Sequence, residues 1–241
     1  MNEYDLNIDL TKVGIIIPAY NESKTIGKLI DQLSKLGNWH ILVVDDGSID
    51  NTDQIVLDKS VKNQKIHLLR HVVNIGPAFA IHSGVTFGLK LGCIFFVQVD
   101  GDGQHPPKEI SKLLSTLIDG SYDIVIGSRY LKKTNYETSF TRSFGIWGSS
   151  KIISMFCGQK ITDVTSGFRA FNVKYAKLII KYYLSIETLF EYSIKISKED
   201  IKMKEIPMNM TKRNFGKSYL SLPKLFLYPF RISYSVLRAI I

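Results

Sequence analysis

One stretch constrains this chain more than any other: a charge-free, mainly apolar run from Ile94 to Val99 that ends in two carboxylates, Asp100 and Asp102. A run of this kind is typical of a parallel strand that is buried on both faces. Ligands of open α/β sheets bind just beyond the carboxyl ends of such strands. The sequence therefore predicts that the two acids lie where chemistry is usually found.

The spacing of Asp100 and Asp102 favours a divalent cation. Two carboxylates this close repel each other unless a cation neutralises them, and Mg²⁺ or Mn²⁺ is commonly held by one or two carboxylates together with phosphate oxygens of a substrate. Gly101 and Gly103 would let a diphosphate approach the backbone closely. The alternative is a strand-to-loop turn in which Asp and Gly serve only the turn.

The rest of the chain repeats the alternation of strand and helix. Short β-branched or apolar runs predict strands over 13–18, 39–44, 65–70, 123–129 and 201–207. Segments with a helical period follow them, over 26–36 with Ser23 as its cap, from 52 onward, and over 76–91, 109–117 and 187–196. Residues 132–151 are interpreted as a loop that enters a helix, and 163–169 as a turn. We expect an α/β protein with a largely parallel sheet covered by helices on both faces.

Composition and charge bound the class of protein. With 241 residues, of which 45% are apolar, the chain can bury one good core and is best described as one domain with an appendage. The net charge is +9, and residues 202–241 contain eight basic residues against one acid. From Pro229 onward a helical wheel gives a basic stripe that includes Arg231 and Arg238, and a wide apolar face. Such a helix suits a membrane surface, or packs on the domain; it does not suit nucleic acid.

The cysteines and the first residues of the chain indicate the cellular compartment. Cys93 and Cys157 offer neither a disulfide framework nor metal-ligand spacing. The chain begins without a basic and apolar signal segment, and no run approaches the length that crosses a bilayer. We expect a cytoplasmic protein, peripheral on the cytoplasmic face of a membrane. A longer natural chain with an anchor, or a membrane-anchored partner subunit, stays open.

Six motifs then occur in the order and spacing of one known family. They are 18-PAYNE-22, 44-VDDGS-48, 74-NIG-76, 100-DGDGQHPP-107, 127-GSR-129 and 163-DVTSGFR-169. Together they resemble the family 2 inverting glycosyltransferases, which have the GT-A fold, over residues 13–219. The branch that the chain resembles most is that of dolichol-phosphate mannose synthase and related polyprenyl-phosphate glycosyltransferases. The resemblance implies a nucleotide-sugar-binding catalytic domain over 1–220 and an amphipathic, membrane-apposed tail over 221–241.

The resemblance also implies roles for individual residues. The donor nucleotide would lie among Pro18, Tyr20, Glu22, Asp45, Asp46 and Gly76, with Asp46 favoured for the base contact. Asp100 and Asp102 would hold the metal and the donor diphosphate, with Gln104 nearby, and Arg213 would clamp the diphosphate from a loop in which Tyr219 replaces the usual lysine. Arg129 and Arg142 would receive an acceptor phosphate, and Asp163 and Arg169 would flank it.

The chemistry agrees with this interpretation. Cleavage of a sugar–diphosphate bond builds charge on the leaving phosphate, which a metal and an arginine stabilise. A phosphate acceptor has a second pKa of about 6, so it is already ionised at neutral pH and needs no general base. A saccharide hydroxyl would need one, and Asp163, Glu187 and Glu191 are the candidates. These alternatives stay open, as does a non-catalytic sugar-nucleotide-binding subunit.

Overall fold

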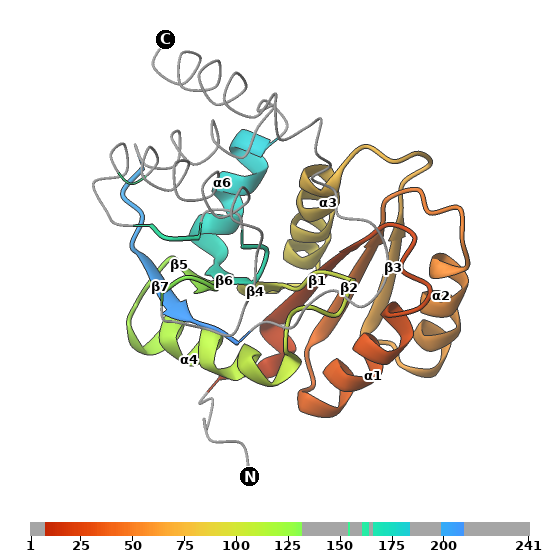
Figure 1. The fold of residues 1–241 in the computed structure, drawn as a ribbon, viewed down its shortest axis with the longest axis horizontal. Coiled ribbons are helices and arrows are strands. Elements are labelled where there is room, and N and C mark those ends of the chain that lie inside the picture. Colours follow the sequence, from red (N-terminus) through yellow and green to blue (C-terminus); the bar gives the residue numbers. More distant parts are fainter. Residues whose placement is uncertain (1–7, 132–153, 155–160, 164–165, 184–198, 210–241) are drawn as a thin grey trace.

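A seven-stranded sheet organises the molecule (Figure 1). The computed structural model describes residues 8–131, 154, 161–163, 166–183 and 199–209. The strands are β1 (Val13–Ala19), β2 (His40–Asp45), β3 (Ile66–Arg70), β4 (Phe95–Gln98), β5 (Ile124–Ser128), β6 (Arg169–Asn172) and β7 (Met203–Pro207). Their order in the sheet is β3-β2-β1-β4-β6-β5-β7. Paired neighbours run parallel except that β6 is antiparallel to both β4 and β5.

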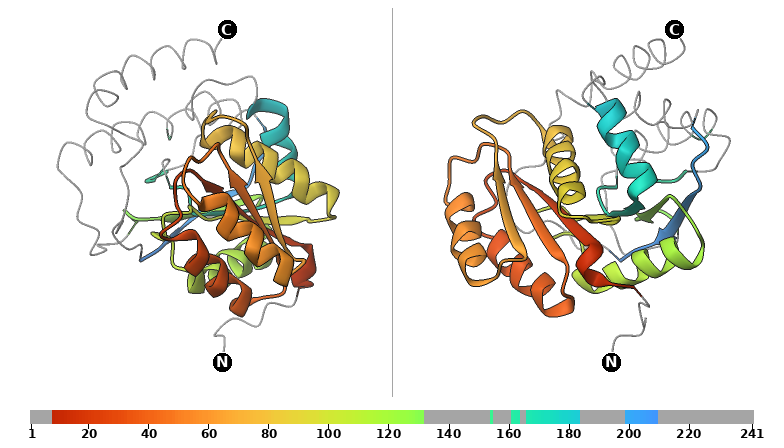
Figure 2. Two further views of the ribbon diagram at one scale, coloured as in Figure 1. Left: turned by 90° about the vertical axis from the view of Figure 1, so that its right-hand side faces the viewer. Right: turned by 180° about the vertical axis from the view of Figure 1, so that it is seen from behind.

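Helices cover both faces of this sheet (Figures 1 and 2). They are α1 (Ile26–Leu36), α2 (Thr52–Lys62), α3 (Pro77–Lys90), α4 (Ile110–Asp119) and α6 (Val173–Tyr183), with short 3₁₀ turns at Leu10–Lys12 and Pro107–Glu109. Helices α1, α2 and α4 lie on one face, and α3 and α6 lie on the other. The two layers are the ones that a mostly parallel sheet needs in order to bury both of its faces.

The core divides along the pleat of β1. Ile15 and Ile17 join the buried cluster beneath α1, α2 and α4, whereas Ile16 joins the cluster beneath α3 and α6 together with Leu42 and Phe96. This division follows from the alternation of side chains along a strand. Each fully buried side chain of this size contributes roughly 1.5–3 kcal/mol to folding through its removal from water, so the central strands hold the carboxyl edge of the sheet in place.

The expected largely parallel sheet is confirmed, with two additions. Strand β6 and helix α6 were not expected, and the segment 163–169 enters β6 at Arg169. The prediction that Ser23 caps the first helix is wrong, because α1 begins at Ile26 with Thr25 at the cap position, and the backbone N–H of Ser23 donates to Asp50 instead. Predictions for 132–151, 187–196 and the tail 221–241 lie outside the described residues.

The part of the chain that the structure describes contains no helix with both the length and the apolar character needed to cross a membrane.

Candidate active site at the carboxyl edge of the sheet

The loops after β1 and β2 brace each other through side-chain hydrogen bonds. The backbone N–H of Asn21, which has φ +56°, donates to Ser48 Oγ over 2.9 Å, and the N–H of Glu22 donates to Thr52 Oγ1 over 2.9 Å. Asp50 accepts from Thr52 and Ser23, and although burial alone would raise its pKa, these hydrogen bonds hold the pKa of Asp50 below the ordinary value. Two polar loops are thus fixed side by side without any ligand.

Asp45 and Asp46, predicted near the donor nucleotide, are both buried. Asp46 Oδ1 accepts from the N–H of Ile75 and lies 2.7 Å from His71 Nδ1, and Asp46 Oδ2 accepts from the N–H of Gly76 over 2.8 Å. The predicted contact of Asp46 with the base stays a prediction. These contacts show that Asp46 holds the loop after β3 in place.

Asp45 makes fewer contacts than its neighbour. Its Oδ1 accepts from the N–H of Ser48 over 3.0 Å. Its Oδ2 is buried without a hydrogen-bond partner and lies 3.4 Å from Nε of the half-exposed Arg70, in an ion pair whose alignment is too poor for a hydrogen bond. Tyr20, directly after β1, is 45% exposed at the same edge of the sheet, and its predicted role in donor binding stays a prediction.

The acid loop after β4 carries the predicted metal ligands. The side chain of Asp100 is 40% exposed, and Asp102 Oδ1 accepts from the N–H of Gln104 over 3.0 Å. Gly103 has φ +74°, and open space surrounds the position that a Cβ would occupy there. A Cβ on Gly101 would instead lie 3.3 Å from the carbonyl oxygen of Pro18. Among the described residues there is thus open space beside Gly103, whereas Pro18 lies close to Gly101; the expected approach of a diphosphate to both glycines stays a prediction.

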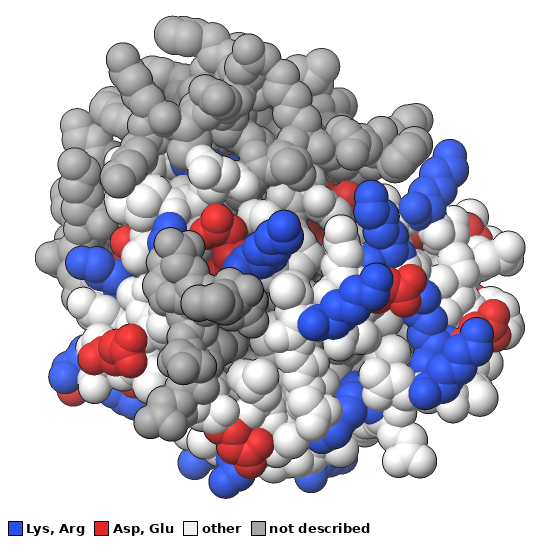
Figure 3. Space-filling view, turned by 90° about the horizontal axis from the view of Figure 1, so that it is seen from below, with Lys and Arg blue, Asp and Glu red and all other residues white. Residues whose placement is uncertain are grey.

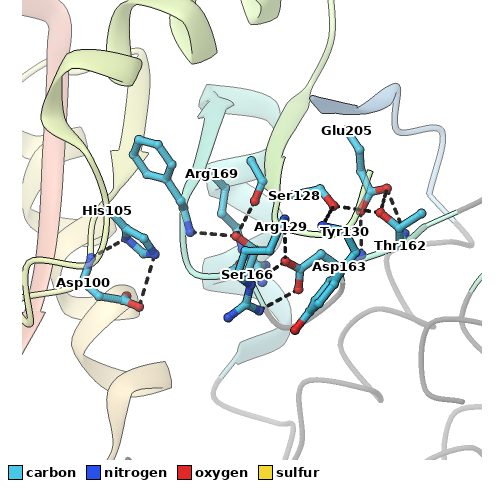
Figure 4. A network of polar contacts seen from close by, with 12 residues as sticks. Asp100, His105, Ser128, Arg129, Tyr130, Thr162, Asp163, Ser166, Arg169 and Glu205 are labelled. Carbon is cyan, nitrogen blue, oxygen red and sulfur yellow. Dashed lines mark hydrogen bonds and ion pairs between the residues drawn. The ribbon is translucent and has the colours of Figure 1, made fainter. Parts of the chain in front are cut away.

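His105, to which no role was given from the sequence, lies beside Asp100 and contacts it twice (Figure 4). Its Nδ1 accepts from the backbone N–H of Asp100 over 2.9 Å, and its Nε2 lies 3.6 Å from Asp100 Oδ2. The ring is buried and stacks on Phe168 with centroids 4.9 Å apart. The only feature of the sequence that could have indicated a role for His105 is its closeness to Asp100 and Asp102. Its partner Phe168 is remote in the sequence.

Arg129, the predicted acceptor-side arginine, is held by Asp163. Its Nε donates to Asp163 Oδ2 and its Nη2 to Asp163 Oδ1, each over 2.7 Å, and its backbone N–H also donates to Asp163 Oδ2. Both residues are buried. This two-pronged pairing fixes the plane of the guanidinium group.

Glu205 of β7, which the sequence analysis did not single out, supports this pair. Its Oε1 accepts from the N–H of Asp163 over 2.9 Å, and its Oε2 accepts from the N–H and the hydroxyl of Thr162 over 2.8 Å each. Burial raises the pKa of Glu205, the nearby charge of Asp163 adds to this, and the hydrogen bonds from Asp163 and Thr162 oppose it. No pattern around an isolated glutamate in a strand could have indicated this contact.

A short segment joins the two halves of the site (Figure 4). Ser166 Oγ donates to the carbonyl oxygen of Gly127, two residues before Arg129 in the sequence. One residue later, a Cβ on Gly167 would lie 2.6 Å from Asp100 Oδ1. Arg169 Nε donates back to the carbonyl oxygen of Ser166. The segment Ser166–Arg169 thus contacts the acid loop and the arginine strand at once. Arg142, Arg213, Glu187 and Glu191 lie outside the described residues.

The acid loop fits a cation that arrives with a phosphate ligand. Among the described residues there is no group of three or more His, Cys, Asp or Glu side chains that could hold a metal ion. The protein would contribute the carboxylates of Asp100 and Asp102, which are not fully buried, and diphosphate oxygens would fill other positions, as Mg²⁺ and Mn²⁺ readily allow.

Comparison with known proteins agrees with this geometry. Residues 14–179 match the family described as glycosyl transferase family 2. The chain is 32% identical over 209 residues to UDP-N-acetylglucosamine–dolichyl-phosphate N-acetylglucosaminyltransferase of Methanococcus voltae, covering 80% of this chain and 83% of that one. It is 29% identical over 216 residues to polyprenol monophosphomannose synthase of Mycolicibacterium smegmatis, covering 86% of this chain and 80% of that one.

A solved structure supports the fold. Glucosyl-3-phosphoglycerate synthase of Mycobacterium tuberculosis, crystallised with Mn²⁺, uridine diphosphate and phosphoglyceric acid, superposes with a TM-score of 0.66 at 15% identity, over 94% of this chain and 78% of that one. At this identity the likeness concerns the GT-A fold alone. The family match covers most of the chain, and the expected relationship is confirmed: this protein belongs to glycosyl transferase family 2 and is a glycosyltransferase.

Proposed function

We propose that this enzyme transfers a hexose, with inversion, from a nucleotide-diphosphate sugar to a polyprenyl phosphate. The observation that carries the proposal is the convergence of Asp100 and Arg129 on one edge of the sheet, linked by Ser166–Arg169. The acid loop suits a cation-bound diphosphate, and a guanidinium group suits a second phosphate. A lipid phosphate supplies that second phosphate and an ionised nucleophile together.

The residues have complementary tasks in this scheme. When bound, Mg²⁺ or Mn²⁺ would neutralise the charge that develops on the leaving diphosphate. Asp100 and Asp102 would orient that cation, and the braced loops at Tyr20 and Asp45 would receive the nucleotide. Arg129 would offset the repulsion between acceptor phosphate and donor diphosphate, with its guanidinium plane already fixed by Asp163. Preorganisation of this kind lowers the barrier because little rearrangement is needed during the reaction.

The geometry argues against Asp163 as the general base that a saccharide hydroxyl acceptor would need. Such an acceptor needs a base, and Asp163 is fully buried with both of its oxygens engaged by Arg129. Removal of a proton by Asp163 would weaken the pairing that holds the arginine. The relatives from M. voltae and M. smegmatis are both named as lipid-phosphate glycosyltransferases, and these names support a lipid phosphate as the acceptor.

A membrane location follows from the acceptor. A polyprenyl chain stays in the bilayer, so the enzyme must work at its surface, and the basic, apolar stretch from Pro229 to Ile241 suits that contact. We place the reaction at the cytoplasmic face, and assign residues 1–220 to catalysis and 221–241 to attachment. A membrane-anchored partner subunit would serve the same end.

A lipid-extraction assay tests the proposal. The purified protein is incubated with Mn²⁺ or Mg²⁺, a panel of radiolabelled nucleotide sugars, and either undecaprenyl phosphate or dolichyl phosphate in detergent. We expect label to enter the organic phase with one of the sugars, and to be lost when the metal is chelated. Undecaprenol, which has a hydroxyl group in place of the phosphate, is the matched acceptor control and should stay unlabelled.

Two outcomes would contradict the proposal. Equal labelling of undecaprenol would favour a hydroxyl acceptor, and donor binding without transfer to either lipid would favour a sugar-nucleotide-binding subunit. Asp102→Asn serves as the protein control. It removes one charge from the acid loop and should abolish transfer while leaving the fold intact.

A further inference from the structure

We propose that His105 is a positioning residue for the metal carboxylate, and that it acts as the neutral tautomer with its proton on Nε2. This inference rests on the proposed function, because it concerns the acid loop that would hold the cation. It adds a residue behind that loop, together with the contacts through which it acts. His105 touches neither the donor nor the reacting atoms; it acts through Asp100.

The tautomer follows from the distances between heavy atoms. The backbone N–H of Asp100 points at His105 Nδ1 over 2.9 Å. A backbone N–H can only donate, so Nδ1 must present a lone pair. A proton on Nδ1 would set two donors against each other at hydrogen-bond distance. The ring proton of the neutral imidazole therefore belongs on Nε2.

The proton on Nε2 faces the carboxylate of Asp100. His105 Nε2 lies 3.6 Å from Asp100 Oδ2, which is too long for a hydrogen bond but close enough for electrostatic attraction. The positive end of the N–H bond thus lies beside the oxygen that would bear negative charge toward a cation. One imidazole ring therefore fixes the start of the acid loop through Nδ1 and attracts the side chain of the same residue through Nε2.

The ring itself has little freedom to turn. It is only 4% exposed, and it stacks on Phe168 at an interplanar angle of 20°. A Cβ at position 167 would lie 2.6 Å from Oδ1 and 2.7 Å from Oδ2 of Asp100, so only glycine leaves room for these oxygens. The carboxylate of Asp100 is therefore confined both by a fixed imidazole and by the backbone of Gly167.

Metal sites in proteins commonly contain residues that do not bind the metal themselves but orient the side chains that do. Groups that orient a ligating side chain typically change metal affinity by about 10–100-fold when they are removed. In this protein the orienting group is His105, which stacks on Phe168. Phe168 belongs to the segment Ser166–Arg169, and Ser166 of that segment donates to Gly127 of β5. Through this segment the acid loop is linked to the acceptor side of the site.

Binding measurements with Mn²⁺ and uridine or guanosine diphosphate test the inference without any lipid. His105→Asn keeps an acceptor near the position of Nδ1 and has nothing at the position of Nε2. His105→Phe keeps a ring against Phe168 and loses both polar contacts. We expect both variants to bind Mn²⁺ about tenfold or more weakly in calorimetry or electron paramagnetic resonance. His82→Asn, a histidine of α3 with a buried Nε2, is the matched control and should bind as the unaltered protein does.

The tautomer has its own readout in the metal-free protein. Nitrogen-15 spectra of the histidine rings distinguish a protonated from an unprotonated ring nitrogen, and His105→Asn identifies the resonances of His105 by their loss. We expect Nε2 to carry the proton. A proton on Nδ1 would overturn the inference, and so would unchanged Mn²⁺ affinity in both variants. If the unaltered protein binds no diphosphate with Mn²⁺, the proposed function fails instead.

Discussion

Single glycines with a positive φ differ in how much the fold depends on them. Gly47 has φ +73°, and a Cβ there would lie 2.5 Å from the carbonyl carbon of Val73 and 2.6 Å from the nitrogen of Asn74. Gly92 has a similar φ of +80°, but nothing lies within 4 Å of its Cβ position. Substitution of Gly92 by alanine therefore tests the backbone conformation alone, whereas the same substitution at Gly47 also introduces a steric clash.

We expect Gly47→Ala to lower the free energy of unfolding by more than Gly92→Ala does. Each substitution should cost roughly 1–3 kcal/mol for the unfavourable conformation, and Gly47→Ala also displaces the loop that Asp46 holds. Urea denaturation of both variants measures the difference. Equal losses would mean that the loop at Val73 yields without cost. Loss of nucleotide binding in Gly47→Ala alone would tie that loop to the donor site.

The pairing of elements at the acceptor side supports a second prediction. Asp163→Asn leaves the buried Arg129 without its ionic partner, and removal of one member of a buried pair typically costs about 3–5 kcal/mol. We expect a loss of this size in denaturant unfolding, together with loss of transfer. Asp31→Asn is the control, because its pair with Lys59 is partly exposed and should contribute less than about 1 kcal/mol. Similar losses in both would contradict the assigned geometry.

Strands β2 and β3 carry a pair of histidines that predicts sensitivity to acid. His40 Nδ1 lies 3.0 Å from His67 Nε2. Burial, with a smaller contribution from Lys65, lowers the pKa of both below the ordinary value of 6.5. Near and below pH 6.5 the histidines of the unfolded chain bind protons more readily than those of the folded protein. The free energy of unfolding therefore decreases as the pH falls below 6.5.

Unfolding in urea at about pH 7.5 and at about pH 5.5 measures this dependence. We expect His67→Leu to reduce the difference between the two conditions, whatever its effect on stability at the higher pH. A difference equal to that of the unaltered protein would mean that other groups cause the acid sensitivity.

At the scale of the molecule, the charge is distributed unevenly along the chain. The face on which α1 and α4 lie shows Lys and Arg dispersed among acidic and uncharged side chains (Figure 3), whereas the sequence from 202 to 241 is strongly basic. We predict that deletion of Pro229–Ile241 weakens flotation with anionic liposomes and leaves binding of the nucleotide diphosphate unchanged. Equal flotation of both proteins would remove the tail from the proposed attachment.

Sequence patterns predicted the sheet better than the site. The strands with long apolar runs were found because a buried parallel strand needs such a run, and the acids after β4 were found because they end one. Strand β6 was missed because Arg169–Asn172 is only four residues long and passes directly into α6. The sequence could not indicate that Asp46 turns toward Gly76 or that His105 meets Phe168, because both depend on how separate loops pack.

The antiparallel strand β6 also determines when the molecule can be completed during synthesis. Phe96 of β4 pairs with Phe171, and Ile124 of β5 pairs with the same residue, so among the described strands the two halves of the sheet meet only through β6. A nascent chain that ends before Phe171 can form β1 to β4, because those strands are close in sequence and fold early, but one edge of β4 is then unpaired. Such an edge readily joins other chains. We therefore expect this protein to depend most on protection from aggregation in the interval between the emergence of Gln98, which completes β4, and that of Asn172, which completes β6.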